Sequence, residues 1–362
     1  MNGRPGFASR TAARGFVLLL VLGVLVVLSL LAGAIAITVD RVRHDQQIAD
    51  QRLQGELELR STEATVLFLL ATQRITFAGL TVDDKIVLTP SEQEQVKEGE
   101  SVISFAPVGN EIRMDGTVYQ GFGHAMFDLR ADSGKISVNW TNPMVVAKWL
   151  GRLGVSPDQL GSLRARLLDY QDPDNDRRIG GAETDQYRAL GLEPPPNRPL
   201  ITALELRQVL GWNQALKHLD NRQLMSQATV YRWAQICINT APASVLAALP
   251  GVSEQQAERV VALRSVQAFQ NLSSVQELLP TLPPEDDLVS LFPGFSGTLN
   301  LWPGRGTGGW AVHWTLTPFD DGGRPWRIDY EIRSSARSGS GDATARKAQT
   351  ALLSGSPAAN IR

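Results

Sequence analysis

An uncharged run of 24 residues near the N-terminus, from Phe16 to Val39, is the feature that most constrains how this chain folds. As a helix rising about 1.5 Å per residue, the run would be roughly 36 Å long, enough to cross a hydrocarbon core of roughly 30 Å. Residues 1–15 contain three arginines and no acidic residue, and basic flanks stay on the cytoplasmic side of a membrane. We therefore predict a single-pass transmembrane helix over residues 16–39, with a cytoplasmic N-terminus.

A cleaved secretory signal peptide is the alternative explanation of this run, with Ala32-Gly33-Ala34 as its cleavage site. A signal peptide has an apolar region of about 7–15 residues, whereas here the apolar sequence continues past Ala34. Beyond the span, apolar residues recur near helical spacing at Ile48, Leu53, Leu57, Val66 and Leu70. The span is therefore predicted to continue as one helix over residues 40–75.

The pattern changes after this helix. Alternating and β-branched residues separated by glycines predict strands at 102–108, 111–115, 118–129 and 136–140. Helical patterns with polar caps then predict short helices at 143–153, 156–170, 202–218, 224–235, 242–249, 253–264 and 273–279. Alternation returns at 310–317 and 326–333, on either side of the turn-forming sequence Asp320-Asp321-Gly322-Gly323.

These segments predict an α+β fold. Because an isolated hairpin is marginal in water, we expect the last two strands to join the first sheet. The long N-terminal helix would pack on a pilin-like antiparallel sheet, begun by residues 76–142 and completed by residues 292–333. An all-helical insertion would occupy residues 143–291. Two tandem domains followed by a separate hairpin are the alternative. Residues 334–362, rich in Ser, Gly and Ala, are expected to be disordered.

An acidic segment within the predicted insertion matches the ligand spacing of a calcium loop. Loop positions 1, 3, 5 and 12 are Asp172, Asp174, Asp176 and Glu183, and Asp169 and Asp185 beside them are further candidate ligands. Position 6, where an EF-hand needs glycine, is Arg177. Because the segment lacks Cys and His, it favours calcium over zinc. The alternative is a solvated acidic loop with Asx turns.

Residues 238–264 resemble a helix-hairpin-helix, a motif that often binds DNA phosphates through the amides of its hairpin. Here the second helix begins with Glu254 and includes Glu258, which would repel phosphate. The net charge of −2 supplies no bulk positive charge. A structural hairpin is therefore favoured, and no nucleic-acid partner is expected. A membrane-anchored DNA receptor of the competence type stays as the alternative function.

No combination of residues predicts an enzyme. The four histidines are scattered at positions 44, 124, 218 and 313, and no nucleophile–base set or GxSxG motif occurs. The single cysteine, Cys237, lies between two isoleucines and cannot form an intramolecular disulfide. We therefore expect a buried, inert thiol.

Gly15 followed by Phe16, directly before the span, resembles the processing site of type IV prepilins and pseudopilins. In that family a membrane-bound prepilin peptidase cuts after the glycine, so residues 1–15 would be the leader. Leu20 stands at the fifth position of the mature chain, where most members of that family carry glutamate. The absence of this glutamate is typical of K-type minor pseudopilins. Further matches to that type follow in order along the chain: Leu168-Asp169-Tyr170-Gln171-Asp172-Pro173-Asp174, Gly181-Ala182-Glu183, Asn197-Arg198-Pro199-Leu200 and Ile238-Asn239-Thr240-Ala241.

The chain thus resembles the general secretion pathway protein K family of type II secretion. The resemblance implies an inner-membrane protein whose main domain is periplasmic, with a pilin-like fold and a helical insertion that binds calcium. It also implies a place at the tip of the pseudopilus beside the I-type and J-type minor pseudopilins. There it would help to initiate or limit pseudopilus growth during protein export across the outer membrane. Other pseudopilus subunits and the inner-membrane secretion platform would be further partners.

Overall fold

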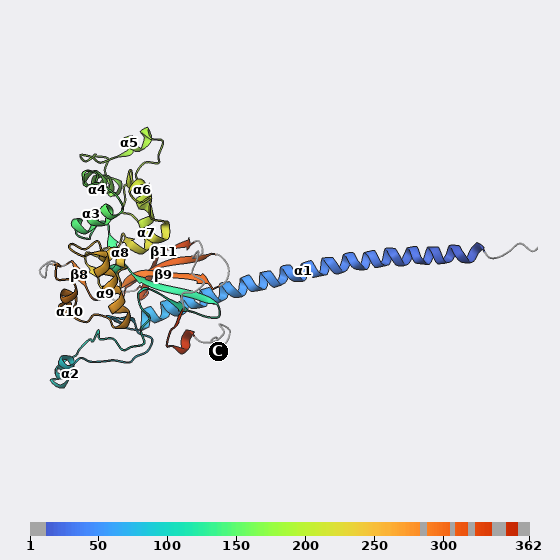
Figure 1. The fold of residues 1–362 in the computed structure, drawn as a ribbon, viewed down its shortest axis with the longest axis horizontal. Coiled ribbons are helices and arrows are strands. Elements are labelled where there is room, and N and C mark those ends of the chain that lie inside the picture. The colour runs from blue at the N-terminus through green and yellow to red at the C-terminus, as the bar shows by residue number, and fades with distance from the viewer. Residues whose placement is uncertain (1–11, 283–287, 305–307, 318–322, 335–344, 354–362) are drawn as a thin grey trace, which may run out of the picture. The chain divides into compact units, whose positions relative to one another are not determined.

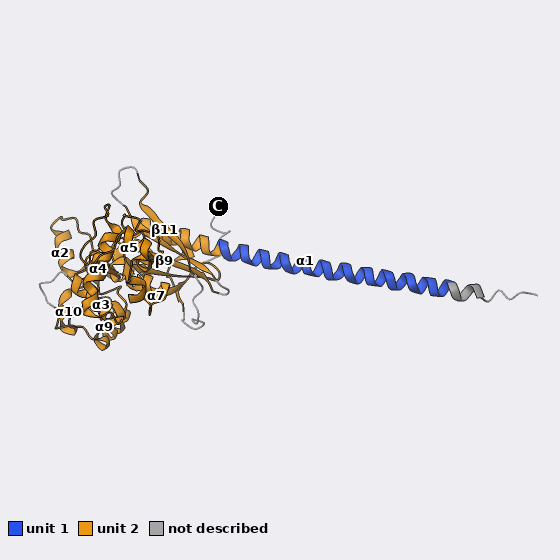
Figure 2. Cartoon of the chain, turned by 90° about the horizontal axis from the view of Figure 1, so that it is seen from above, with its two compact units in different colours: residues 1–57 blue, residues 58–362 orange. Residues whose placement is uncertain are grey.

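The structure, a computed structural model, describes the chain except residues 1–11, 283–287, 305–307, 318–322, 335–344 and 354–362. Helix α1 runs from Ala12 to Thr72, and the chain divides into two compact units, residues 1–57 and 58–362 (Figure 2). In the first unit, every side chain from Val17 to Gln47 is exposed. Among the described residues, α1 is the one helix long and apolar enough to cross a membrane.

The second unit is built on a six-stranded sheet with the order β11-β10-β9-β4-β3-β12, of which Figure 1 labels β9 and β11. Its strands are β3 (Asp115–Gln120), β4 (Ala125–Ala131), β9 (Ser296–Pro303), β10 (Gly309–Leu316), β11 (Trp326–Ser334) and β12 (Arg346–Lys347). All neighbours are antiparallel except β12, which pairs with β3 in parallel. The sheet therefore joins strands that lie on both sides of a long intervening segment.

One face of this sheet packs against the part of α1 that begins at Glu58. Val66 and Leu69 of the helix share a core with Phe127, Leu299 and Trp314 of the sheet, and all five side chains are buried. Successive residues of a strand point to opposite faces, so the pattern of β10 places Trp314 in this core. The first apolar core is therefore formed between one helix and one sheet face, and it fixes the sheet to α1.

Between α1 and the sheet the chain forms β1 (Ile75–Thr76), β2 (Gly79–Leu80) and α2 (Pro90–Lys97). Thr89 and Glu92 form a capping box at the start of α2, although the helix buries none of its residues. Residues 102–108, predicted as a strand, form none, and the predicted strand 118–129 is a hairpin because its chain turns between Gln120 and Ala125.

The insertion occupies residues 132–295, the connection between the neighbouring strands β4 and β9. Its elements are η1 (Asp132–Gly134), β5 (Ile136–Ser137), α3 (Pro143–Arg152), α4 (Pro157–Gln171), α5 (Thr184–Ala189), η2 (Ala203–Gln208), α6 (Trp212–Ala215), α7 (Asn221–Gln227), β6 (Ala228–Thr229), β7 (Ile236–Cys237), α8 (Ala243–Leu246), α9 (Glu254–Val266), α10 (Leu272–Leu278) and β8 (Val289–Ser290). These elements share a second apolar core that includes Trp149, Tyr187 and Trp212.

The structure confirms that the last two predicted strands complete the first sheet, so the tandem-domain alternative is wrong. Four details differ from the sequence-based expectations. The sheet is mixed, since β12 is parallel, and the insertion is not all-helical, since β5–β6 and β7–β8 are parallel pairs. The predicted helix 202–218 is interrupted because the chain becomes extended at Val209 and Gly211 then adopts φ +87°. The helix predicted at 224–235 ends at Gln227, where β6 begins.

The C-terminal segment also differs from the expectation of disorder. Residues 345–353 contain β12 and η3 (Ala351–Leu353), and Leu353 is buried in the first core. Disorder is therefore the wrong prediction for these residues and for Ser334, which ends β11. The remainder of that segment, and most of the turn predicted at 320–323, lie outside the described residues.

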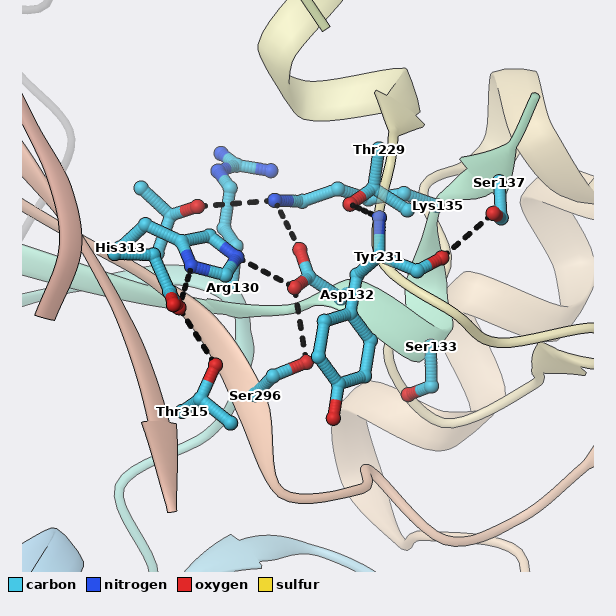
Figure 3. A network of polar contacts seen from close by, with 12 residues as sticks. Arg130, Asp132, Ser133, Lys135, Ser137, Thr229, Tyr231, Ser296, His313 and Thr315 are labelled. Carbon is cyan, nitrogen blue, oxygen red and sulfur yellow. Dashed lines mark hydrogen bonds and ion pairs between the residues drawn. The ribbon is translucent and has the colours of Figure 1, made fainter. Parts of the chain in front are cut away.

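A buried polar network joins the start of the insertion to the second face of the sheet (Figure 3). His313 of β10 lies between two carboxylates, 2.7 Å from Asp132 of η1 and 2.8 Å from Asp329 of β11. The second oxygen of Asp132 accepts a hydrogen bond from Lys135 at 2.9 Å, and Lys135 also donates to Thr298 of β9 at 3.0 Å. The insertion is thus joined to β10 by the ion pair of Asp132 with His313 and to β9 by the hydrogen bond from Lys135 to Thr298, and His313 extends the network to Asp329 of β11.

Candidate metal centre

The candidate metal centre lies where α4 ends and α5 begins. Asp169 belongs to the last turn of α4, Asp172 is its C-cap, and Glu183 is the N-cap of α5. Leu167 and Tyr170 anchor the end of α4 in the insertion core, which draws Asp169 into the interior. Two helix ends therefore hold carboxylates at both sides of the acidic loop.

Three of the six predicted ligands converge. Single oxygens of Asp169, Asp172 and Glu183 lie within 4.8 Å of one another, and the side chains of Asp169 and Glu183 are 0% and 4% exposed. Both oxygens of Glu183 and Oδ1 of Asp172 are buried without a hydrogen-bond partner in the described structure. Buried carboxylate oxygens without donors are costly, and oxygen ligands of this kind are those that calcium prefers. The residues therefore fit a hard cation.

The electrostatics of Glu183 reflect this crowding. Burial, together with repulsion from Asp169, Asp172 and Asp174, raises the pKa of Glu183 to about 7. A nearby positive charge would favour the ionised carboxylate and lower that pKa again. Arg178 lowers the pKa of Glu183, but not enough to offset burial and this repulsion.

The other three predicted ligands lie outside this group. Asp174 and Asp176 are exposed, and Oδ1 of Asp174 accepts a hydrogen bond from the backbone N–H of Asp176 at 2.8 Å, the Asx-turn arrangement of an acidic loop. Asp185 is exposed in the first turn of α5. The acidic segment thus contains an exposed turn as well as the group of converging carboxylates.

Sequence reasoning missed two polar residues at this centre. Arg178 forms ion pairs with Asp169, at 2.8 Å, and with Asp172. Asn197 adopts φ +48° and donates to the backbone oxygen of Asp174 at 2.7 Å, while its own side-chain oxygen is buried without a partner in the described structure. The only sequence signal for Arg178 is its position between the candidate ligands Asp176 and Glu183. Asn197 lies outside the acidic segment, so no local pattern pointed to it.

Gly181 closes the loop against Asp169. A Cβ at this position would lie 1.9 Å from Oδ2 of Asp169, so only glycine allows the backbone to approach the buried carboxylate. The Gly-Ala-Glu sequence therefore positions Glu183 by letting the chain turn tightly over Asp169.

The helix-hairpin-helix segment makes contacts within the insertion. Lys148 of α3 donates to the backbone oxygens of Leu249 and Val252 at 2.6 and 2.9 Å, and Arg152 pairs with Glu254 at 2.7 Å. The hairpin is thus attached to α3 through its carbonyl oxygens and a carboxylate. These contacts support the structural interpretation of the hairpin over the DNA-binding one.

Cys237 is fully buried in β7, as the sequence predicted. Burial raises the pKa of its thiol, which keeps the side chain in the unreactive form.

Comparisons with known proteins point to one family. Two family models, both described as type II secretion system (T2SS), protein K, match residues 127–219 and 238–290, and the first match includes the three converging carboxylates. No curated protein matches the chain. One similar solved chain comes from the crystal structure of the GspK–GspI–GspJ complex of the enterotoxigenic Escherichia coli type 2 secretion system. It is 14% identical, with a TM-score of 0.47 over 81% of this chain and 99% of that chain. On the two family matches, residues 127–219 and 238–290 of the chain are those of the type II secretion system protein K family.

Proposed function

We propose that this chain is a minor pseudopilin at the tip of the type II secretion pseudopilus. It would be held in the inner membrane by α1, with a cytoplasmic N-terminus and a periplasmic main domain. Its partners would be the I-type and J-type minor pseudopilins, other pseudopilus subunits and the inner-membrane secretion platform. In this position it would initiate or limit pseudopilus growth during protein export across the outer membrane, in a structural role without catalysis.

The insertion between β4 and β9 is the observation that carries this proposal. Two neighbouring antiparallel strands need only a short hairpin turn, yet here residues 132–295 connect them, with an apolar core of their own. A domain of this size would obstruct the addition of another subunit above it. The absence of a carboxylate at Leu20 agrees with that role, because a subunit at the tip has no neighbour whose N-terminal ammonium it must neutralise.

We further propose that Asp169, Asp172 and Glu183 hold a calcium ion, with Asp174, Asp176 and Asp185 as the more distant acidic residues of the loop. The bound ion would supply positive charge and no reaction. Asp172 and Glu183 offer buried oxygens that lack donors, and both belong to helix ends that the loop connects. Their convergence would fix α4 relative to α5 and so shape the surface presented to the neighbouring pseudopilins.

Assembly with the I-type and J-type pseudopilins is the experiment that tests the tip position. We expect the full chain, co-expressed with both and purified in detergent, to elute with them as one complex. Failure of the folded chain to associate with either would contradict the proposal. A DNA-mobility assay at two salt concentrations tests the alternative function, a membrane-anchored DNA receptor. Such a receptor would bind DNA and lose affinity steeply as the salt concentration rises.

Processing at Gly15 is a separate prediction of the same function. The mature protein should begin at Phe16, and Gly15→Val should leave the leader attached, because the peptidase would no longer find a glycine before the cleaved bond. N-terminal sequencing and the shift in mass measure both results. Gly23→Val, also within α1 and with no atom near the added side chain, should be processed normally. A mature protein that begins after Ala34 would identify a secretory signal instead.

A further inference from the structure

Arg178 places a positive charge at the candidate metal centre. Its guanidinium pairs with both Asp169 and Asp172, and its backbone N–H donates to the second oxygen of Asp169 at 3.3 Å. We infer that Arg178 is an internal counter-ion that occupies these carboxylates in the absence of calcium and is displaced when calcium binds. Arg178 would then set the calcium affinity of the loop. This inference rests on the calcium site proposed above.

Burial explains why the carboxylates need a counter-ion without calcium. Asp169 is completely buried and two other carboxylates lie beside it. A buried carboxylate that loses its only positive partner is strongly destabilising. Arg178 supplies that partner from within the loop, so the loop can remain closed over Asp169 when no metal is bound.

The distribution of free oxygens explains why calcium and Arg178 compete. Without displacing Arg178, a cation would find three unpartnered carboxylate oxygens, two from Glu183 and one from Asp172. Calcium takes 6–8 oxygen ligands and favours carboxylates among them, so it would compete with Arg178 for the oxygens of Asp169 and Asp172. A guanidinium has donors only, and two positive charges so close together repel each other. Binding of the ion would therefore expel the guanidinium.

The position of Arg178 makes its departure easy. Its side chain is 43% exposed, and the loop from Asp174 to Gly180 is exposed throughout. The guanidinium can therefore rotate into water, where it is well solvated, without unfolding either helix. Asp169, in contrast, is held inside by α4 and cannot follow it.

Arg177 provides a matched control. It carries the same charge, lies one residue away and is exposed, and it forms no ion pair within the described part of the chain, in contrast to Arg178. Any change that reflects only the net charge of the loop should appear equally in both variants. A change confined to Arg178 reports the direct competition.

The test is calcium titration by calorimetry of the full chain in detergent, after chelator treatment, for the wild type, Arg178→Gln and Arg177→Gln. We expect Arg178→Gln to lower the Kd for calcium by about tenfold or more, because no cation must then leave. Arg177→Gln should change it by less than about threefold, since exposed charges are screened. In chelator, Arg178→Gln should melt at a lower temperature than either other protein, and saturating calcium should remove that difference.

Arg178→Lys keeps the charge but loses the planar fork, and it serves if Arg178→Gln does not fold in chelator. We expect Arg178→Lys to bind calcium more tightly than the wild type. Equal or weaker affinity in whichever Arg178 variant folds would overturn the inference, as would equal gains in Arg178→Gln and Arg177→Gln. Absence of calcium binding in the wild type would overturn both this inference and the calcium site. The tip position would still be decided by assembly with the I-type and J-type pseudopilins.

Discussion

His313→Leu should lower the free energy of unfolding by about 3–5 kcal/mol, the cost of removing one partner from a buried ion pair. The change takes the positive charge from between Asp132 and Asp329. Asp132 is 1% exposed and would keep only Lys135 as a charged partner. Denaturant titration of the full chain measures the loss. Because this network joins the insertion to the sheet, we expect a single weakened transition rather than separate unfolding of the two cores.

The same histidine predicts a dependence of stability on pH. Burial lowers the pKa of His313, but attraction to Asp132 and the hydrogen bonds that the protonated ring donates to both carboxylates outweigh it and raise the pKa from 6.5 to about 9. Lys135 opposes this rise. Burial raises the pKa of Asp329, but hydrogen bonds from His313, Thr315 and Arg327 outweigh it and lower that pKa to about 2. A raised pKa stabilises the fold fully below the unfolded value and progressively less as pH rises through the folded value. The stabilisation is therefore present at pH 6 and lost between about 6.5 and 9.

The comparison of wild type with His313→Leu at pH 6 and pH 9.5 tests this window. The difference in unfolding free energy should shrink by about 3 kcal/mol, at 1.36 kcal/mol per unit of pKa shift. His124 lies exposed in the turn between β3 and β4, so His124→Leu should change the stability by less than about 0.5 kcal/mol at either pH. A difference that stays constant from pH 6 to pH 9.5 would show that folding does not raise the pKa of His313.

Calcium should raise the free energy of unfolding of the full chain by about 2.7 kcal/mol when the free ion is a hundredfold above its Kd. Asp172→Asn combined with Glu183→Gln should remove this response, because the two residues supply all three unpartnered carboxylate oxygens of the group. The double variant should be no less stable than the wild type in chelator, since it also removes repulsion between buried carboxylates. Thermal or denaturant melting with calcium and with chelator gives all four values.

Asp185→Asn is the control for this double variant. Asp185 belongs to the acidic pattern of the sequence but is exposed and outside the converging group, so its variant should keep the full calcium response. Loss of the response in Asp185→Asn would favour the wider ligand set over the group of three. If every protein has the same stability with calcium and with chelator, the calcium site is wrong and the segment is a solvated acidic loop.

The elements that sequence reasoning predicted well are those that local chemistry specifies. An uncharged run produces α1, caps and prolines define α3 and α9, and alternation identifies β10 and β11. Each signal lies within the element that it predicts. For the candidate site, the spacing of acidic residues located the loop and included the three residues that converge. The spacing could not show that Asp172 joins the converging group whereas Asp176 is exposed, because the exposure of each side chain depends on which other parts of the chain pack beside it.

The sequence by itself determined the long apolar N-terminal helix, the α+β class and the acidic loop of this protein. Only the tertiary structure decided three features: β4 pairs with β9, Arg178 forms an ion pair with Asp169, and His313 pairs with Asp132, from which it is separated by 181 positions in the sequence. Local patterns report what each segment prefers to bury, whereas pairing and charge neutralisation depend on which segments the two cores bring together. Buried charges carry no local signature, since each is acceptable only when the fold places a partner of opposite charge beside it.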